Sequence, residues 1–298
     1  MNPLKKLLET GQPILLDGAM GTMLMDAGLE QGDPPEEWNV KHPDRIRAVH
    51  RSYIEAGSRV VLTNSFGGTR FRLEMHGLQD RVIELNKAAA LNARAEADAA
   101  PDMVVVAGSM GPTGQLFEPM GILTFEDAKA AFAEQAKGLA EGGVDVFWVE
   151  TMSDLNEVKA AVEGARSVSD LPIVTTMSFD THGHTMMGVS PVKALEILGA
   201  LDVIALGANC GTGSDELEVA IKTMREADPD VTLVAKANAG IPQVVAGGEI
   251  VYNGTPEVMA QYARNVRELG VSMIGGCCGS TPKHIRAMAE ALGSPVPG

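Results

Sequence analysis

Two adjacent cysteines stand near the end of the chain, in the segment GGCCGSTP at residues 275–282. They are Cys277 and Cys278, and the third cysteine of the protein, Cys210, stands in GANCGTG at residues 207–213. Both motifs follow a short apolar run of the kind that forms a buried strand. If these runs are parallel strands of one barrel, all three thiols lie on the face where the strands end.

Metal binding is the chemistry that uses all three cysteines. Thiolates prefer zinc among the common cytosolic metals, and three protein ligands leave one tetrahedral position open, as in catalytic zinc sites. The flanking glycines let two adjacent sulfurs turn toward one ion. Two other interpretations stay open: buried cysteines packed as small hydrophobic side chains, and a redox pair at Cys277 and Cys278 that leaves Cys210 unexplained.

A zinc ion held by three thiolates carries a net charge of about −1, so it activates water poorly and suits a soft ligand. A substrate thiol with an ordinary pKa of about 8.5 loses its proton on coordination, and the excess negative charge keeps the sulfur nucleophilic. The three cysteines therefore predict attack by a zinc-bound substrate thiolate.

The pattern of apolar residues in the rest of the chain predicts alternating strands and helices. Short apolar runs at 13–17, 58–64, 103–109, 144–150, 172–178, 202–209, 231–237 and 271–276 are predicted strands. Each run precedes a segment with apolar residues three and four apart, and Thr124, Ser190, Thr255 and Thr281 mark helix starts. Eight such pairs in 298 residues predict one (β/α)8 TIM barrel over residues 1–298, with a doubly wound sheet as the alternative.

Four long segments follow predicted strands and are expected to form loops at the mouth of the barrel. They cover residues 18–42, 65–80, 110–123 and 238–254. Loops of this length often carry function.

The composition argues against several partners. A formal net charge of −15 and a pI of about 4.8 offer no basic surface for nucleic acid or an anionic membrane. No segment has the apolar core of a signal peptide or the roughly 20 apolar residues of a membrane span. Three cysteines do not make a disulfide framework. We expect a soluble, cytoplasmic protein without nucleic-acid or membrane partners.

A series of motifs runs along nearly the whole chain: LLDGAMGTML (15–24), TNSFGG (63–68), GSMGPTG (108–114), VETMSD (149–154), GANCGTG (207–213), KANAGIP (236–242) and GGCCGSTP (275–282). In these motifs the chain resembles the zinc-dependent homocysteine S-methyltransferases. It looks most like the homocysteine-binding module of cobalamin-dependent methionine synthase, and it is also similar to betaine-homocysteine methyltransferase. The resemblance implies a TIM barrel that methylates homocysteine to methionine.

The resemblance also implies roles for single residues. The cysteine of NCG and both cysteines of GGCC hold zinc in that family, so Cys210, Cys277 and Cys278 are the expected Zn²⁺ ligands and catalytic centre. The resemblance also implies that Asn238, the asparagine of ANAG, lies near the fourth zinc position.

The amino-acid end of homocysteine needs an acidic partner and hydrogen-bond donors. The resemblance assigns its amino group to Asp17 and Glu150, for which a purely structural role is the alternative. Backbone amides around Gly18 to Gly21 and Ser109 to Gly111 can serve the carboxylate, or can simply form tight turns.

The methyl donor is left open by the sequence. One hypothesis is a free-standing homocysteine module of a split system that receives its methyl group from methylcobalamin on a separate corrinoid protein. The alternative is a self-contained enzyme that uses betaine, S-methylmethionine or another onium donor. A hypothesis of another class is a non-catalytic module that binds zinc or a thiol.

Overall fold

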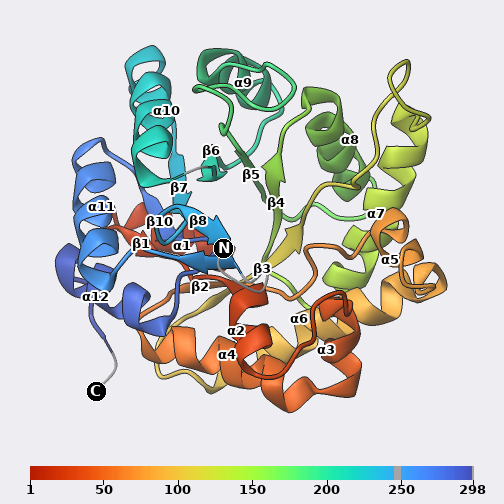
Figure 1. The fold of residues 1–298 in the computed structure, drawn as a ribbon, viewed down its shortest axis with the longest axis horizontal. Helices are drawn as coiled ribbons and strands as arrows, with labels where there is room; N and C mark the ends of the chain where they lie inside the picture. The colour runs from red at the N-terminus through yellow and green to blue at the C-terminus, as the bar shows by residue number, and fades with distance from the viewer. Residues whose placement is uncertain (212, 245–249, 297–298) are drawn as a thin grey trace.

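The computed structural model describes residues 1–211, 213–244 and 250–296. Its main sheet has eight parallel strands in the order β1-β10-β7-β6-β5-β4-β3-β2. A parallel bridge between Leu16 and Val60 joins the first strand to the second and closes the ring. The protein is therefore a (β/α)8 barrel, as predicted (Figure 1).

All eight predicted strands are present. They are β1 (Ile14–Leu15), β2 (Val60–Leu62), β3 (Val105–Met110), β4 (Val146–Met152), β5 (Ile173–Met177), β6 (Ala205–Cys210), β7 (Leu233–Ala237) and β10 (Met273–Gly276). Each is fully or almost fully buried, because helices cover the outside of the barrel and side chains fill its interior.

The helices form a ring around the strands (Figure 1). They are α1 (Pro3–Glu9), α2 (Met20–Asp26), α3 (Trp38–Lys41), α4 (Pro43–Glu55), α5 (Arg70–Glu74), α6 (Val82–Ala99), α7 (Phe125–Glu141), α8 (Leu155–Arg166), α9 (Pro191–Gly199), α10 (Ser214–Ala227), α11 (Pro256–Glu268) and α12 (Pro282–Leu292), with the 3-10 turns η1 (Pro35–Glu37) and η2 (Gln79–Arg81). The side chains of Thr124, Ser190 and Thr255 cap their helices as predicted, by accepting hydrogen bonds from backbone N–H groups.

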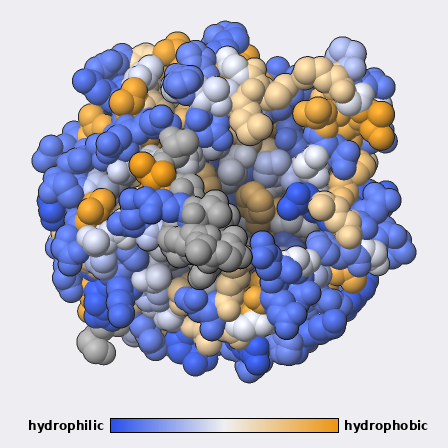
Figure 2. Space-filling view, in the orientation of Figure 1, coloured by the Kyte–Doolittle hydropathy of each residue, from blue (hydrophilic) through white to orange (hydrophobic). Residues whose placement is uncertain are grey.

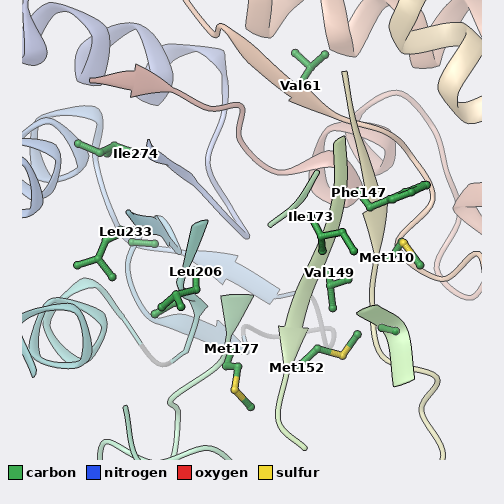
Figure 3. Packing of buried hydrophobic residues seen from close by; sticks show 14 of the residues in the cluster. Val61, Met110, Phe147, Val149, Met152, Ile173, Met177, Leu206, Leu233 and Ile274 are labelled. Atoms are coloured by element: carbon green, nitrogen blue, oxygen red, sulfur yellow. The ribbon is translucent and has the colours of Figure 1, made fainter. Parts of the chain in front are cut away.

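Side chains at alternate positions along the strands belong to two separate apolar clusters. Phe147, Val149 and Leu206 belong to the layer between the strands and the helices (Figure 3). Trp148 and Val174 belong to the cluster inside the barrel. This alternation follows from the period of two along a strand.

Helix α1 closes the end of the barrel opposite the strand ends. Leu4 and Leu7 pack into the inner cluster. The Asn2 amide donates a hydrogen bond to the carbonyl of Asp145, which precedes β4. The interior is therefore plugged at this end, and access is from the other face.

Two of the expected loops contain short helices, and a third contains a hairpin. Residues 18–42 include α2 and α3, and residues 65–80 include α5. The segment 238–254 holds the antiparallel strands β8 (Pro242–Val244) and β9 (Ile250–Tyr252), and residues 245–249 lie outside the described part. Strands of three residues are too short to show a periodicity in the sequence. Within the described ranges, none of the helices has the length and apolar character that a membrane crossing requires.

Candidate metal and substrate site

The three cysteines meet at the mouth of the barrel. Cys210 is the last residue of β6, and Cys277 and Cys278 directly follow β10. The Sγ atom of Cys210 lies 3.0 Å from that of Cys277 and 3.8 Å from that of Cys278. All three Sγ atoms lie within 4.8 Å of one another. The expected juxtaposition of the thiols is thus present.

The spacing of the thiols suits one small, soft ion. Tetrahedral zinc with Zn–S bonds of about 2.3 Å separates its sulfurs by about 3.8 Å. The Cys210–Cys278 separation of 3.8 Å matches this value, and the 3.0 Å between Cys210 and Cys277 needs only a small opening. No other trio of His, Cys, Asp or Glu side chains in the described ranges brings its ligand atoms this close.

Asn209 fixes the end of β6 from which Cys210 projects. Its Oδ1 accepts hydrogen bonds from the backbone N–H of Thr151 at 2.9 Å and from the Thr176 hydroxyl at 2.7 Å. Its Nδ2 donates to the Thr151 hydroxyl at 2.7 Å. Cys210 itself has a left-handed backbone with a φ of 59°, a conformation that a non-glycine residue adopts only at a local energy penalty. The amide of Asn209 therefore holds a strained ligand position in place.

Asn238 joins the two cysteine-bearing loops. Its Oδ1 accepts a hydrogen bond from the backbone N–H of Cys278 at 3.0 Å, and its Nδ2 donates to the carbonyl of Gly211 at 2.8 Å. Asn238 contacts the loops that carry the thiols and is not among the residues that line the pocket, so its expected place near the fourth zinc position stays a prediction. Its amide serves the backbone of the ligand loops in this structure.

The thiols influence one another's protonation. Hydrogen bonds from Cys210 and Cys277, and from the Tyr252 hydroxyl, hold the pKa of Cys278 well below its ordinary value. Hydrogen bonds to the other two cysteines, together with burial, raise the pKa of Cys210. For Cys277 the hydrogen bond with Cys210 lowers the pKa, but the hydrogen bond with Cys278 and burial outweigh it and raise the pKa. The geometry therefore favours one thiolate before any cation arrives, and a cation is required to make all three ionise.

A second set of polar side chains lies at the bottom of the barrel mouth, and we call it the charged floor: Asp17, Ser109, Glu150 and Lys236. The Nζ atom of Lys236 lies 3.0 Å from Oδ1 of Asp17, and Oδ2 of Asp17 accepts a hydrogen bond from the backbone N–H of Leu62 at 2.6 Å. The Ser109 hydroxyl donates to Oε1 of Glu150. These four polar side chains are all buried.

One ammonium and two carboxyl groups share this floor, so the charges are not fully balanced. Burial raises the pKa of Glu150 to about 7, although the nearby Lys236 opposes the shift. Burial also raises the pKa of Asp17, again against the effect of Lys236. Burial alone would lower the pKa of Lys236, but the two carboxylates raise it. The floor is therefore suited to exchange its proton for a cationic group of a ligand.

Lys236 was not predicted as a site residue. It is the lysine of KANAGIP, and it interrupts the otherwise apolar strand VTLVAKA at residues 231–237. A charged residue within a buried strand needs a buried partner. That signal was present in the sequence, but only the fold shows that the partner is Asp17.

One pocket of about 320 Å³ opens over the thiols and the floor. Its lining includes the three cysteines, Asp17, Ser109, Glu150 and Lys236. Glu36, Phe66, Arg72 and His76, from the loops that follow β1 and β2, also line this pocket. The face of the molecule shown in Figure 2 is hollowed near its centre.

The fold and the site together define a TIM barrel with three thiols and a buried charged floor in one pocket. The homocysteine S-methyltransferase family matches residues 14–292. The chain belongs to this family, and the resemblance found in the sequence is confirmed.

Curated relatives carry the name methionine synthase. The protein from Mycobacterium leprae is 35% identical over 96% of this chain, and the protein from Mycobacterium tuberculosis is 35% identical over 93% of it. The chain spans only 25% and 24% of their respective lengths.

Solved structures agree with the fold and the family. The metallated form of the homocysteine methyltransferase MmuM from Escherichia coli has a TM-score of 0.82 and 25% identity, and the alignment covers 97% of this chain and 99% of that one. Its oxidised form has the same TM-score and 26% identity over the same shares of the two chains.

Proposed function

We propose that this chain methylates the thiol of homocysteine to give methionine, with Zn²⁺ held by Cys210, Cys277 and Cys278. The observation that carries the proposal is one pocket that contains both the three thiols and the buried charged floor. Family membership supports the substrate. We further propose that residues 1–298 act as one homocysteine-binding barrel domain. The free thiols require a reducing compartment, which supports a cytoplasmic location.

Zinc, when bound, favours the thiolate form of a coordinated substrate thiol, which makes that sulfur the nucleophile. The chain supplies three sulfur ligands and leaves the fourth tetrahedral position to the substrate. Asn209 and Asn238 hold the loops that carry these ligands. Their hydrogen bonds orient the thiols in the way that an outer shell orients metal ligands elsewhere.

The charged floor is proposed to bind the amino-acid end of homocysteine. Glu150 and Asp17 offer negative charge to the substrate ammonium, and Ser109 and Lys236 offer donors to its carboxylate. Because the floor lies in the same pocket as the thiols, binding there would hold the substrate sulfur close to the metal position. A purely structural role for the carboxylates would leave homocysteine affinity unchanged when they are replaced.

Two methyl sources are consistent with this pocket. The first is methylcobalamin on a separate corrinoid protein, with this chain as the homocysteine module; the name methionine synthase of the curated relatives supports the product of the reaction. The second candidate is a small onium donor, which Glu36 and Phe66 in the pocket lining support. In either case the donor carbon must approach the sulfur in line with its leaving group.

Zinc content and product formation test the proposal together. We expect about one zinc per chain and methionine formed from homocysteine with one of these donors: methylcobalamin, betaine, S-methylmethionine or S-adenosylmethionine. Zinc near one per chain without methionine from any donor, even with a corrinoid protein added, would support the non-catalytic binding module instead.

A further inference from the structure

The three cysteine sulfurs of the proposed zinc site are themselves nucleophiles. Cys210, Cys277 and Cys278 all line the pocket, and each is only partly buried. Their Sγ atoms lie within 4.8 Å of one another, and a substrate sulfur at the fourth tetrahedral position would lie about 3.8 Å from each of them. A methyl donor that reaches the substrate sulfur therefore also comes close to the ligand sulfurs.

Methylation of a ligand sulfur would destroy the site. A lone pair of the cysteine thiolate would form the new carbon–sulfur bond, and the bond from the methyl carbon to its leaving group would break, with the electron pair departing on that group. The product is a neutral thioether, which has lost the negative charge of a thiolate ligand. Because the pocket leaves the ligand sulfurs accessible, selective transfer requires that they be less nucleophilic than the substrate sulfur.

Tyr252 contacts one of these sulfurs. It is the last residue of β9, in the hairpin that follows β7, and its hydroxyl forms a hydrogen bond with the thiol of Cys278. Its ring packs against the backbone of Gly279, where a Cβ atom would overlap Cβ and Cγ of the tyrosine. A thiolate has no hydrogen to give, so the hydroxyl is the donor whenever Cys278 is ionised.

Backbone contacts fix the segment that carries Tyr252 to the loop of the adjacent cysteines. The N–H of Gly254 donates to the carbonyl of Ala239 at 2.8 Å, and the N–H of Ala239 donates to the carbonyl of Cys278 at 2.9 Å. Nε2 of His284, on α12, donates to the carbonyl of Gly254 at 3.0 Å, because its Nδ1 accepts from a backbone N–H. The tyrosine hydroxyl is therefore held in place relative to the sulfur.

Asn209 contacts a second sulfur, that of Cys277. Its Nδ2 lies 3.8 Å from Sγ of Cys277. The orientation of the amide is fixed, because Oδ1 accepts from the Thr151 N–H and the Thr176 hydroxyl, and Nδ2 donates one hydrogen to the Thr151 hydroxyl. Asn209 is buried, and its second amide hydrogen is left for the sulfur.

A hydrogen bond to a thiolate lowers the nucleophilicity of the sulfur. The donor stabilises the negative charge, and this stabilisation fades as the charge passes into the new carbon–sulfur bond. The nucleophilicity of a thiolate also falls with its basicity, with a Brønsted coefficient of about 0.4 to 0.5. Groups around a metal site tune its ligands in this way. Loss of one such hydrogen bond should therefore make the sulfur several times more reactive.

We propose that Tyr252 and Asn209 determine which sulfur reacts, because their hydrogen bonds to Cys278 and Cys277 make these ligand sulfurs poorer nucleophiles and leave methyl transfer to the substrate thiolate. The inference rests on the proposed function and deepens it. Neither Tyr252 nor Asn209 lines the pocket, so both act through the ligand sulfurs, as positioning residues.

Site-resolved methylation of the zinc-loaded protein tests the assignment. Iodomethane is the probe, homocysteine is left out, and tandem mass spectrometry measures the initial rate of methylation at each cysteine. Tyr252→Phe keeps the ring on Gly279 and removes the hydroxyl. We expect methylation of Cys278 to become about 3- to 10-fold faster than in wild type, while that of Cys277 changes by less than about twofold.

Asn209→Asp should give the complementary pattern. The carboxylate can still accept from Thr151 and Thr176, but it has no hydrogen for the sulfur and places its charge beside it. We expect methylation of Cys277 to become about 2- to 5-fold faster, with a smaller change at Cys278. A purely structural role would loosen the whole site, so methylation would rise at all three cysteines in both variants.

Tyr262→Phe is the matched control for Tyr252→Phe. It removes a buried tyrosine hydroxyl that makes no hydrogen bond to a cysteine in the described ranges. Its three methylation rates should equal those of wild type.

Cobalt(II) in place of zinc gives a readout that does not depend on methyl transfer. Loss of a hydrogen bond raises the energy of the sulfur lone pairs, so the sulfur-to-cobalt charge-transfer bands of Tyr252→Phe should move to longer wavelength. Tyr262→Phe should give the wild-type spectrum. Identical spectra in wild type and Tyr252→Phe would mean that no hydrogen bond reaches the metal-bound sulfur, and would overturn the assignment.

The outcomes separate the failure of this inference from that of the proposed function. Unchanged methylation in Tyr252→Phe, or an even rise at all three cysteines, would overturn the inference, and the proposed function would stand if wild type still forms methionine. The complementary patterns without methionine from any donor would refute the transfer to homocysteine and support the protection of the ligand sulfurs. A wild type that binds no zinc would refute both.

Discussion

The ammonium of Lys236 lies 3.0 Å from the carboxylate of Asp17, and the two side chains are only 4% and 3% exposed. β7 carries the lysine, and Asp17 follows the end of β1, with β10 between these two strands in the sheet. The pair therefore ties together parts of the chain that are far apart in the sequence. It also places a fixed positive charge beside Glu150 at the bottom of the pocket.

Replacing Lys236 with methionine should destabilise the protein strongly. The substitution leaves Asp17 as a buried carboxylate without its cation, and breaking such a pair costs about 3 to 5 kcal/mol in free energy of unfolding. Urea unfolding measures the change. Lys41→Met is the control, because Lys41 pairs with Glu37 on the surface and such pairs contribute about 0 to 1 kcal/mol. A similar, small loss in both variants would mean that the buried pair is not important for stability.

Each of the variants Cys210→Ala, Cys277→Ala and Cys278→Ala should hold well below one zinc per chain and lose methyl transfer. Three ligands leave no redundancy, since each thiolate occupies a separate tetrahedral position. Metal analysis after gel filtration measures the occupancy. Met120→Ala, at an exposed position, should retain the zinc of the wild type. Full occupancy in any cysteine variant would remove that cysteine from the proposed ligand set.

The general fold was predictable because its signals are local. Buried parallel strands appear as short apolar runs, and helix starts appear as Thr or Ser before proline, so all eight strands of the barrel were located from the sequence. The three thiols were also predictable, because each stands directly after such a run. Their meeting then follows from the closure of the barrel.

The other parts of the site depend on contacts that the sequence does not encode locally. The pairing of Lys236 with Asp17 joins positions 219 residues apart, and only the closed barrel brings them together. Arg72 belongs to a helix of five residues within an expected loop, and an arginine there resembles an ordinary surface residue. Only the folded structure shows that its side chain lines the pocket.

Glu150→Gln should weaken homocysteine binding by about tenfold or more and leave zinc content unchanged. The amide keeps the size of the side chain and can still accept from Ser109, but it loses the charge that is proposed to face the substrate ammonium. Isothermal titration of the zinc-loaded protein measures the affinity. Glu157→Gln is the matched control, since Glu157 is equally buried but bonds to Thr113 outside the pocket lining. Equal affinities in wild type and Glu150→Gln would assign Glu150 a structural role.

The same variant should change how stability depends on pH. Burial raises the pKa of Glu150 from 4.5 to about 7, with Lys236, Cys277 and Asp17 as the ionisable groups near it. The folded protein therefore holds the proton more tightly than the unfolded chain. The stability that this proton confers is fully present below about pH 4.5 and is lost as the pH rises through 7.

Wild type should consequently lose free energy of unfolding relative to Glu150→Gln between pH 5 and pH 8. The difference should amount to at most about 3 kcal/mol, since one pKa unit corresponds to about 1.4 kcal/mol. Urea unfolding of the metal-free proteins at several pH values measures it, and titrations elsewhere in the chain cancel in the comparison. A difference that stays constant with pH would contradict the raised pKa of Glu150.

Gly207→Ala should disrupt both the barrel and the metal site. A Cβ atom at Gly207, in the middle of β6, would lie 1.9 Å from the carbonyl oxygen of Val234 on the neighbouring strand β7. The strands must separate to admit it, so we expect a loss of about 3 kcal/mol in free energy of unfolding. Cys210 ends the same strand, and a shift of β6 should therefore lower zinc occupancy as well.

Gly199→Ala, at the end of α9, is the matched control for this substitution. A Cβ atom there meets nothing within 4 Å, so its stability should stay within about 0.5 kcal/mol of the wild type. Urea unfolding and metal analysis of both variants make the comparison. Wild-type stability in Gly207→Ala would show that β6 and β7 can separate freely, and the placement of Cys210 by a rigid strand end would then be wrong.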